Sequence, residues 1–193
     1  MRRWLASFDH FGIVAPVYDR GIRTQAIERL RTLADLTPVD WVLDVGGGTG
    51  RIAEGLLPYV GGVCVLDRSL RMLQQATSKG RLACCLGAVE ALPFAEGTFT
   101  KIVAVDSFHH FRDQAGAASE LLRVLAPGGC LVIEEPDIRR FPVKLVALGE
   151  TLALMRSRFR APVELAQYFA SPNTQVRVVE QSPNFWAVVE KLR

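Results

Sequence analysis

A short apolar run followed by four glycines within five residues constrains this chain more than any other feature. Residues 41–45 read Trp-Val-Leu-Asp-Val, and Gly46, Gly47, Gly48 and Gly50 follow them. An apolar run of this length predicts a buried strand. Four glycines so close together carry a large cost in backbone entropy, which indicates that the backbone needs them. The pattern therefore predicts a tight turn from a strand into a helix, where backbone N–H groups face a ligand at close range.

Strand and helix patterns alternate along the rest of the chain. The expected strands are residues 41–45, 61–67, 81–87, 101–106 and 130–135, and the expected helices are residues 22–36, 51–60, 70–79, 113–125 and a stripe over 145–159. Such alternation predicts right-handed βαβ units around a mainly parallel sheet. Two further apolar runs flank Ser182-Pro183-Asn184 and predict a terminal β-hairpin. The expected fold is α/β: a Rossmann-like, doubly wound, mainly parallel sheet with a C-terminal antiparallel β-hairpin.

The length of 193 residues favours a single domain. Within it we expect an N-terminal helical cap over residues 1–36 and a ligand-binding core over residues 41–135. A helical lid is expected over residues 137–170, and the terminal hairpin over residues 175–193.

Composition excludes several classes of protein. The chain is 49% hydrophobic and 22% charged, with a net charge of +3, which is too mild to predict binding to nucleic acid. No window approaches the roughly 18–20 apolar residues that span a bilayer. Asp9 and His10 interrupt the apolar residues near the start, so we expect a mature cytoplasmic protein rather than a signal peptide.

The cysteines lack metal-site spacing and are expected to be reduced and buried: Cys64, Cys84, Cys85 and Cys130.

The glycine loop has two competing interpretations. A dinucleotide fingerprint needs GxGxxG, but Arg51 stands where the third glycine belongs when the count starts at Gly46. Only GxGxxA, in a shifted register ending at Ala53, survives. The spacing DxGxGxG, beginning at Asp44, fits without any shift. Asp67 ends the second expected strand and is suited to accept hydrogen bonds from both hydroxyls of a ribose, as any adenosine-bearing cofactor would require.

Several segments in order resemble the class I S-adenosylmethionine-dependent methyltransferases. Residues 42–50 (VLDVGGGTG) and 67–76 (DRSLRMLQQA) resemble the first two motifs of that family. Residues 87–111 and 120–137 resemble its later segments, and residues 11–20 (FGIVAPVYDR) resemble its Tyr-Asp segment. The branch that the chain resembles is the ubiquinone/menaquinone-biosynthesis type and its small-molecule relatives. The resemblance implies S-adenosyl-L-methionine as cofactor.

The resemblance also implies a role for each matching residue. The methionine end of the cofactor would be held by Asp44, Gly46, Gly48 and Gly50, the ribose by Asp67, and the adenine by Arg68, Met72, Ala88 and Val89. Asp106 and Ser107 would lie near the methyl group, and Tyr18 would close the site. His109, His110 and Asp106 stand at the expected mouth of the crevice and are the candidate catalytic residues. No third ligand with suitable spacing accompanies the two histidines, so the sequence predicts no metal site.

One departure from the family bears on the cofactor. The family usually has Asp where this chain has Ala88, and that carboxylate accepts a hydrogen bond from the adenine amino group. Losing one such bond costs about 0.5–1.5 kcal/mol. An alternative interpretation is therefore a methyltransferase-like domain that binds a cofactor or partner without catalysis. A nicotinamide-dependent oxidoreductase, supported only by the shifted GxGxxA, is a further alternative.

Segment 137–160 bears on the methyl acceptor. It holds six basic residues against Asp137 and Glu150. Arg156 and Arg160 are four apart, which places them on one face if the helix continues that far. One interpretation is a helix packed on the sheet with a solvated basic side. The other is a lid with a basic rim over a small hydrophobic acceptor, which also admits contact with an anionic membrane surface. We expect C- or O-methylation of a small organic acceptor; the acceptor itself and the oligomeric state do not follow from the sequence.

Overall fold

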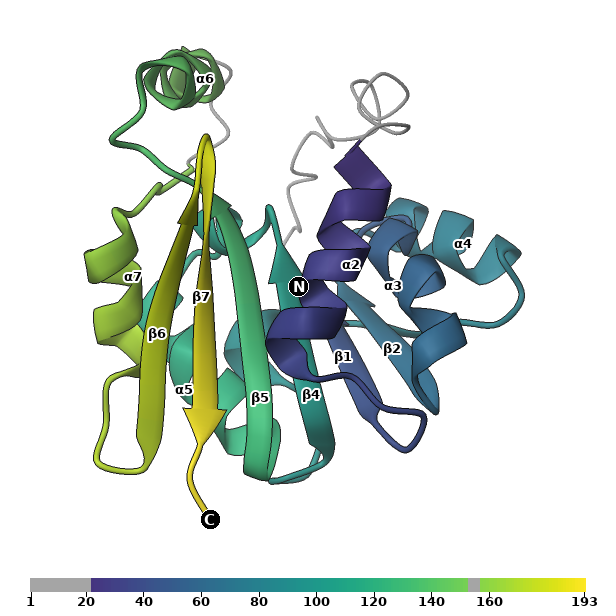
Figure 1. Cartoon of the computed structure of the whole chain (residues 1–193). Helices are drawn as coiled ribbons and strands as arrows, with labels where there is room; N and C mark the ends of the chain where they lie inside the picture. The colour runs from purple at the N-terminus through teal and green to yellow at the C-terminus, as the bar shows by residue number, and fades with distance from the viewer. Residues whose placement is uncertain (1–21, 153–156) are drawn as a thin grey trace, which may run out of the picture.

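The computed structural model describes residues 22–152 and 157–193 as one seven-stranded sheet with helices on both faces (Figure 1). The strand order is β3-β2-β1-β4-β5-β7-β6. Strands β1 to β5 pair in parallel, whereas β7 runs antiparallel to both β5 and β6. The predicted α/β class, the doubly wound sheet and the C-terminal hairpin are confirmed. The order reverses between β1 and β4, which in an open α/β sheet is where a ligand crevice forms.

The described elements follow the predicted alternation closely. The strands are β1 (Trp41–Val45), β2 (Gly62–Asp67), β3 (Ala83–Leu86), β4 (Phe99–Val105), β5 (Leu125–Pro136), β6 (Thr174–Gln181) and β7 (Asn184–Lys191). The helices are α2 (Ile22–Ala34), α3 (Arg51–Leu56), α4 (Leu70–Ser78), α5 (Gln114–Val124), α6 (Phe141–Leu152) and α7 (Pro162–Phe169), with short 3-10 turns η1 (Leu57–Tyr59), η2 (Val89–Ala91) and η3 (Phe108–His110). None of these helices is long and apolar enough to cross a bilayer.

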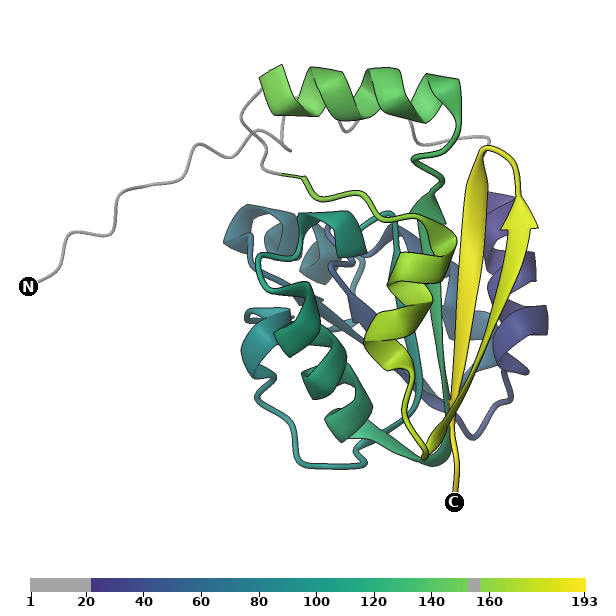
Figure 2. The ribbon, with the colours of Figure 1, turned by 90° about the vertical axis from the view of Figure 1, so that its left-hand side faces the viewer.

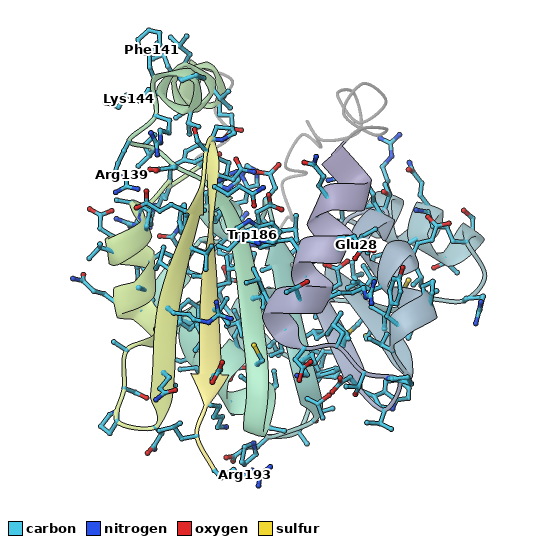
Figure 3. The ribbon with its side chains drawn as sticks, in the orientation of Figure 1. Glu28, Arg139, Phe141, Lys144, Trp186 and Arg193 are labelled. Carbon is cyan, nitrogen blue, oxygen red and sulfur yellow. The ribbon has the colours of Figure 1, made fainter. Side chains whose placement is uncertain are left out.

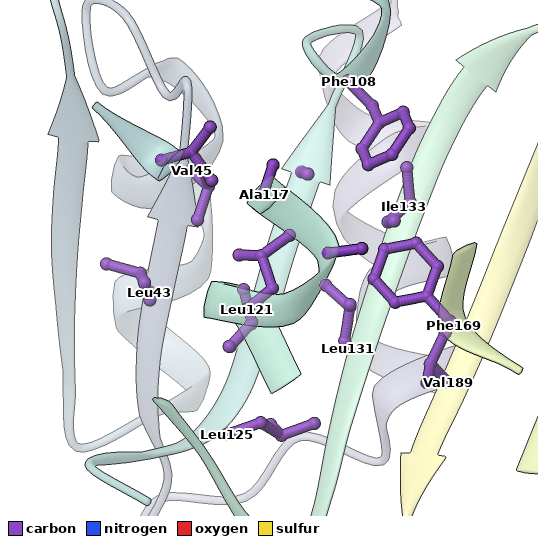
Figure 4. Packing of buried hydrophobic residues seen from close by; sticks show 14 of the residues in the cluster. Leu43, Val45, Phe108, Ala117, Leu121, Leu125, Leu131, Ile133, Phe169 and Val189 are labelled. Carbon is purple, nitrogen blue, oxygen red and sulfur yellow. The ribbon is translucent and has the colours of Figure 1, made fainter. Parts of the chain in front are cut away.

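Alternating strand residues supply two separate cores. Val42 of β1 packs in a cluster with residues of α2, α3 and α4, whereas its neighbour Leu43 packs in the cluster on the opposite face. That second cluster includes Leu121 of α5 and Phe169 of α7, which Figure 4 places around the central strands. Because successive side chains of a strand point to opposite faces, apolar strands without polar gaps require helices on both sides. Figure 2 shows α6 beyond the end of the sheet at which the parallel strands finish.

Two helices differ from the prediction for identifiable reasons. The helix expected over residues 51–60 ends at Leu56 and continues as the 3-10 turn η1. Pro58 lacks a backbone N–H, and its ring crowds the carbonyl four residues earlier, so it ends the α-helix. The stripe expected to run to Phe159 is helical only from Phe141 to Leu152, and residues 157–161 are not helical. The prediction that Arg160 lies on a helical face is therefore wrong, and Arg156 lies outside the described residues.

The segment expected as a lid contains two helices with different surroundings. Among the described helices, α6 alone lies beyond the carboxyl end of β5, on the side of the sheet that holds β7 and β6 (Figure 1). The eight-residue helix α7 falls within the expected helical lid but was not predicted as a separate helix, and it packs against α5 and the hairpin strands β6 and β7. Its side chains Leu165 and Phe169 are fully buried there. Helix α7 thus belongs to the sheet's helical layer, and the lid stays a prediction for α6.

The expectation of four buried cysteines is wrong for two of them. Cys64 and Cys130 are buried, and burial raises the pKa of each thiol to about 11. Cys84 is exposed and Cys85 half-buried, because β3 is the edge strand of the sheet and only the short turn η2 follows it. All four thiols are free.

Candidate cofactor-binding site

The glycine loop adopts a backbone that side chains rarely tolerate. Gly46, Gly48 and Gly50 have φ of +68°, +55° and +72°, in the left-handed region that favours glycine. The N–H groups of Gly46 and Gly47 both donate to the carbonyl of Leu66 at the end of β2. The loop is therefore held against β2 by its own backbone.

Gly46 and Gly48, the two glycines of the DxGxG spacing, have different surroundings. A Cβ on Gly46 would lie 2.7 Å from the Cβ of Ser107, so this glycine is needed for packing. A Cβ on Gly48 would meet no atom within 4 Å among the described residues. Gly48 thus combines a left-handed backbone with space that no described residue fills, which is the geometry of a loop that a ligand approaches closely.

Asp67 joins the glycine loop to the start of α4. Its Oδ2 accepts a hydrogen bond from the backbone N–H of Gly48 at 2.9 Å, and its Oδ1 accepts one from that of Ser69 at 2.8 Å. The backbone carbonyl of Asp67 accepts a bond from Gly87, which brings Ala88 to the same edge of the sheet. Each carboxylate oxygen has a second lone pair, so both remain able to accept from a ribose hydroxyl.

Asp44 lies beneath the loop rather than in it. The side chain is 1% exposed and accepts a hydrogen bond from the backbone N–H of Ala53 at 3.2 Å. Burial raises the pKa of Asp44 to about 7, and the nearby charge of Asp67 adds to the rise. A Cβ on Gly47 would lie 2.5 Å from the Asp44 carboxylate, so this glycine makes room for the acid.

The residues expected around the adenine lie directly after Asp67 and in the segment that follows β3. Arg68 is exposed and Met72, in the first turn of α4, is half-buried, its backbone N–H bonded to the Ser69 hydroxyl that caps the helix. Ala88 precedes η2 with extended backbone and Val89 is buried. Tyr18 lies outside the described residues. Contact of each residue with a cofactor stays a prediction.

The end of β4 is strained and tightly fixed. Asp106 has a φ of +52°, unusual for a residue other than glycine, and its backbone N–H donates to the carbonyl of Glu134. Ser107 is buried, and its hydroxyl donates to the carbonyl of Val45 at 3.0 Å. Glu135, which is fully enclosed, accepts from the N–H groups of Ser107 and Phe108. Strained backbone that neighbouring strands hold in place is typical of functional sites.

The two histidines of η3 have opposite electrostatics. Nδ1 of His109 lies 2.7 Å from Oε2 of Glu135, and both side chains are almost fully buried. Burial lowers the pKa of His109, but the charge and hydrogen bond of Glu135 outweigh it and raise the pKa overall. His110 is half-buried, and burial, together with the charge of His109, lowers its pKa to about 3. His110 is therefore neutral at physiological pH.

Three acids in this region escaped the sequence-based selection. Glu134 and Glu135 lie near the end of β5. Two consecutive acids at the end of an apolar run are the sequence signal that could have identified them. Burial raises the pKa of Glu134, which accepts from Asn184 at 2.8 Å. Glu150 of α6 lies with His109 and His110 in a group whose candidate ligand atoms are all within 4.8 Å of one another. The fold thus supplies the third group that the local sequence spacing lacks.

Part of the basic segment is ion-paired. Arg139 pairs with Asp137 at 2.8 Å and with Glu180 at 2.7 Å. Arg160 donates to the side chain of Gln114 and lies over the ring of Tyr168, away from α6. What α6 exposes is mainly apolar: Phe141, Leu145, Val146 and Leu148. Figure 3 places Phe141 and Lys144 on the outer side of this helix.

Comparisons with known proteins show a similarity to methyltransferases. Residues 43–133 match the model of a methyltransferase domain family. A demethylmenaquinone methyltransferase of Chlorobaculum parvum is 35% identical over 146 residues, which cover 69% of this chain and 61% of that protein. The corresponding enzyme of Chlorobaculum tepidum is 34% identical, over 67% of this chain and 59% of that protein. The chain spans less than two thirds of the length of these curated relatives.

Solved structures share the architecture. The YcgJ protein of Bacillus subtilis superposes with a TM-score of 0.73 at 25% identity, covering 81% of this chain and 70% of that one. An S-adenosylmethionine-dependent methyltransferase of Aquifex aeolicus superposes with a TM-score of 0.71 at 20% identity, over 86% of this chain and 89% of that one, a likeness of fold alone. With the DxGxGxG loop in register and the family match spanning residues 43–133, these findings support a class I S-adenosylmethionine-dependent methyltransferase.

Proposed function

We propose that this protein transfers the methyl group of S-adenosylmethionine to a small hydrophobic acceptor, by C- or O-methylation. The observation that carries the proposal is the open, left-handed Gly48 beside the Asp67 carboxylate. A ligand with vicinal hydroxyls and a chain that lies against the loop fits that pairing. Arg51, where a dinucleotide fold has glycine, favours this cofactor over a nicotinamide.

Different residues of this chain would hold different parts of the cofactor. Asp67 would hold the ribose, and the loop from Asp44 to Gly50 would hold the methionine end. The bound cofactor supplies a methyl group on a positively charged sulfur, which is already a good leaving group. The protein therefore contributes mainly positioning and the exclusion of water.

A proton acceptor is needed only where the acceptor is a phenol or enol. Of the candidate catalytic residues, Asp106 is exposed at the end of β4, whereas His109 is enclosed and bonded to Glu135. We assign proton removal to Asp106 rather than to His109 on this difference in access. His110 stays a candidate for contact with the acceptor.

The apolar surface of α6 supports a hydrophobic acceptor. Phe141, Leu145 and Leu148 recur at intervals of four and three residues, so they lie on one side of the helix. Exposed apolar side chains grouped in this way mark a binding surface more often than isolated ones do. The curated relatives named as demethylmenaquinone methyltransferases give the acceptor class to try first, a reduced quinone with an apolar chain. The same surface suits contact with a membrane that holds such an acceptor.

Transfer of labelled methyl groups to a short-chain demethylmenaquinol tests the proposal. We expect incorporation with the full chain and a lower kcat for Asp106→Asn, whose side chain keeps the left-handed backbone but cannot take a proton. Asp113→Asn, at the start of α5, is the matched control and should leave kcat unchanged. If the full chain binds S-adenosylhomocysteine but methylates neither this quinol nor simple phenols and enols, the non-catalytic binding domain becomes the better account.

A further inference from the structure

We propose that His109, His110 and Glu150 form a binding site for a divalent first-row transition cation, where η3 meets α6. One candidate ligand atom from each residue lies within 4.8 Å of the other two. Two ring nitrogens and one carboxylate oxygen at this separation need only small side-chain adjustments to share a cation. The site goes beyond the proposed methyl transfer and does not depend on it.

The orientation of His109 supports the proposal. Its Nδ1 is engaged by the enclosed carboxylate of Glu135 at 2.7 Å, so Nε2 is the nitrogen that remains for a ligand bond. Histidines that bind metals almost always have their second nitrogen fixed by a carboxylate, a carbonyl or water. Phe159 stacks on the same ring at 4.3 Å between centroids and an angle of 13°, which holds the ring in one plane.

A second observation comes from Glu150. Its Oε2 is buried without a hydrogen-bond partner among the residues that the structure describes. A buried carboxylate oxygen with nothing to accept from is costly, and buried charges are normally paired or bound to a metal. Glu150 is the acidic residue of α6, whose exposed side chains are apolar apart from Lys144. A cation shared with the two histidines would compensate this charge and fasten α6 to η3.

The donor set defines the class of cation. Imidazole nitrogens suit Zn²⁺, Co²⁺, Fe²⁺ and Cu²⁺, whereas Mg²⁺ and Ca²⁺ prefer sites made only of oxygen. Three protein ligands leave at least one coordination position for water or for an oxygen of a bound molecule. We therefore expect tight binding of Zn²⁺ or Co²⁺ and no competition from millimolar Mg²⁺.

Titration of the full chain with Co²⁺ tests the site, because bound Co²⁺ gives ligand-field absorption in the visible range. We expect one equivalent to bind and Zn²⁺ to displace it. Loss of the outer carboxylate partner of a metal-bound histidine weakens binding about 10–100-fold, so loss of a direct ligand in Glu150→Gln or His110→Gln should weaken it by at least that factor. Glu96→Gln, an exposed acid, and His10→Gln, which alters the third histidine of the chain, are the matched controls.

Two outcomes would overturn the site. One is Co²⁺ binding that is equal in Glu150→Gln, His110→Gln and the controls; the other is no Co²⁺ binding to the full chain. Should a variant fail to fold by circular dichroism, electron spin echo spectroscopy of Cu²⁺-loaded His10→Gln protein decides. It should report two coordinated imidazoles, and one or none would contradict the proposal. Binding of S-adenosylhomocysteine, measured on the same samples, separates this result from the proposed methyl transfer.

Discussion

The side chain of Asp67 and the backbone of Gly48 are joined by a hydrogen bond of 2.9 Å between Oδ2 and nitrogen. The bond ties the end of β2 to the loop that follows β1, although the two residues come from different βα units. The acid and the left-handed glycine thereby form one wall at the carboxyl ends of the strands. Substituting Asp67 tests the contact with the ribose, and substituting Gly48 tests the approach of the cofactor to the loop.

Replacing Asp67 by alanine should weaken binding of S-adenosylhomocysteine by about 1.5–3 kcal/mol, because it removes charge-assisted hydrogen bonds to the ribose. Calorimetry measures the change. Asp113→Ala is the control: it removes the side chain that accepts from Gly116 at the start of α5, so it should cost about 1 kcal/mol of stability without changing affinity. An unchanged dissociation constant for Asp67→Ala would mean that the ribose is held elsewhere.

Gly48 and Gly80 form a matched pair for testing the open loop. Both have positive φ, +55° and +77°, and a Cβ on either would meet no described atom within 4 Å. Alanine at each position should therefore cost a similar backbone strain of about 1–2 kcal/mol, seen in urea unfolding. Only Gly48→Ala should also weaken S-adenosylhomocysteine binding, since Gly80 lies at the far end of α4. Equal affinity in the two variants would place the cofactor away from the loop.

Restoring the carboxylate in Ala88→Asp should tighten cofactor binding by about 0.5–1.5 kcal/mol, the value of one hydrogen bond to the adenine amino group. Ala88 precedes η2 and no side chain caps that turn, so the new carboxylate also has a backbone partner within its own segment. Calorimetry with S-adenosylhomocysteine and with S-inosylhomocysteine, which lacks the amino group, separates the two effects. A gain for both ligands, or a fall in affinity, would contradict the adenine contact.

Asp44 should make stability depend on pH. Burial raises its pKa from 3.8 to about 7 in the folded protein. The folded state thus binds the proton more tightly than the unfolded state, so this contribution is fully present below about pH 4 and is lost as pH rises through 7. Urea unfolding between pH 4.5 and 7.5 should show a smaller decline for Asp44→Asn than for the unaltered chain. Parallel profiles would mean that Asp44 is charged throughout this range.

The sequence predicts most of the fold because the decisive patterns are local. The apolar run at 41–45 and the glycines after it specify β1 and its turn without reference to the rest of the chain. The bounds of helix α7 could not be predicted, because its eight residues give too few turns for a periodic signal. The stripe up to Phe159 was misleading, since that ring packs on His109 from a non-helical segment. Tertiary contact, rather than helical period, accounts for its apolar character.

The candidate site likewise contains residues that the sequence predicts and residues that it does not. Asp67 and the glycine loop were predictable because both follow strands that lie side by side in the sheet. Glu135 and Glu150 were not, because their importance comes from contacts with His109 and His110 across 26 residues or more of sequence. No local spacing encodes such contacts. The hydrogen bonds by which Glu135 holds the segment after β4 can therefore be identified only when β5 is known to lie beside β4.

We expect an S-adenosylmethionine-type cofactor to bind at the carboxyl ends of β1 and β2. Isothermal titration of the full chain with S-adenosylhomocysteine and, side by side, with NAD⁺ tests it most directly. We expect saturable binding of one S-adenosylhomocysteine, weakened in Asp67→Ala, and no measurable binding of NAD⁺. Tighter binding of NAD⁺ than of S-adenosylhomocysteine would mean that the loop does not hold this cofactor.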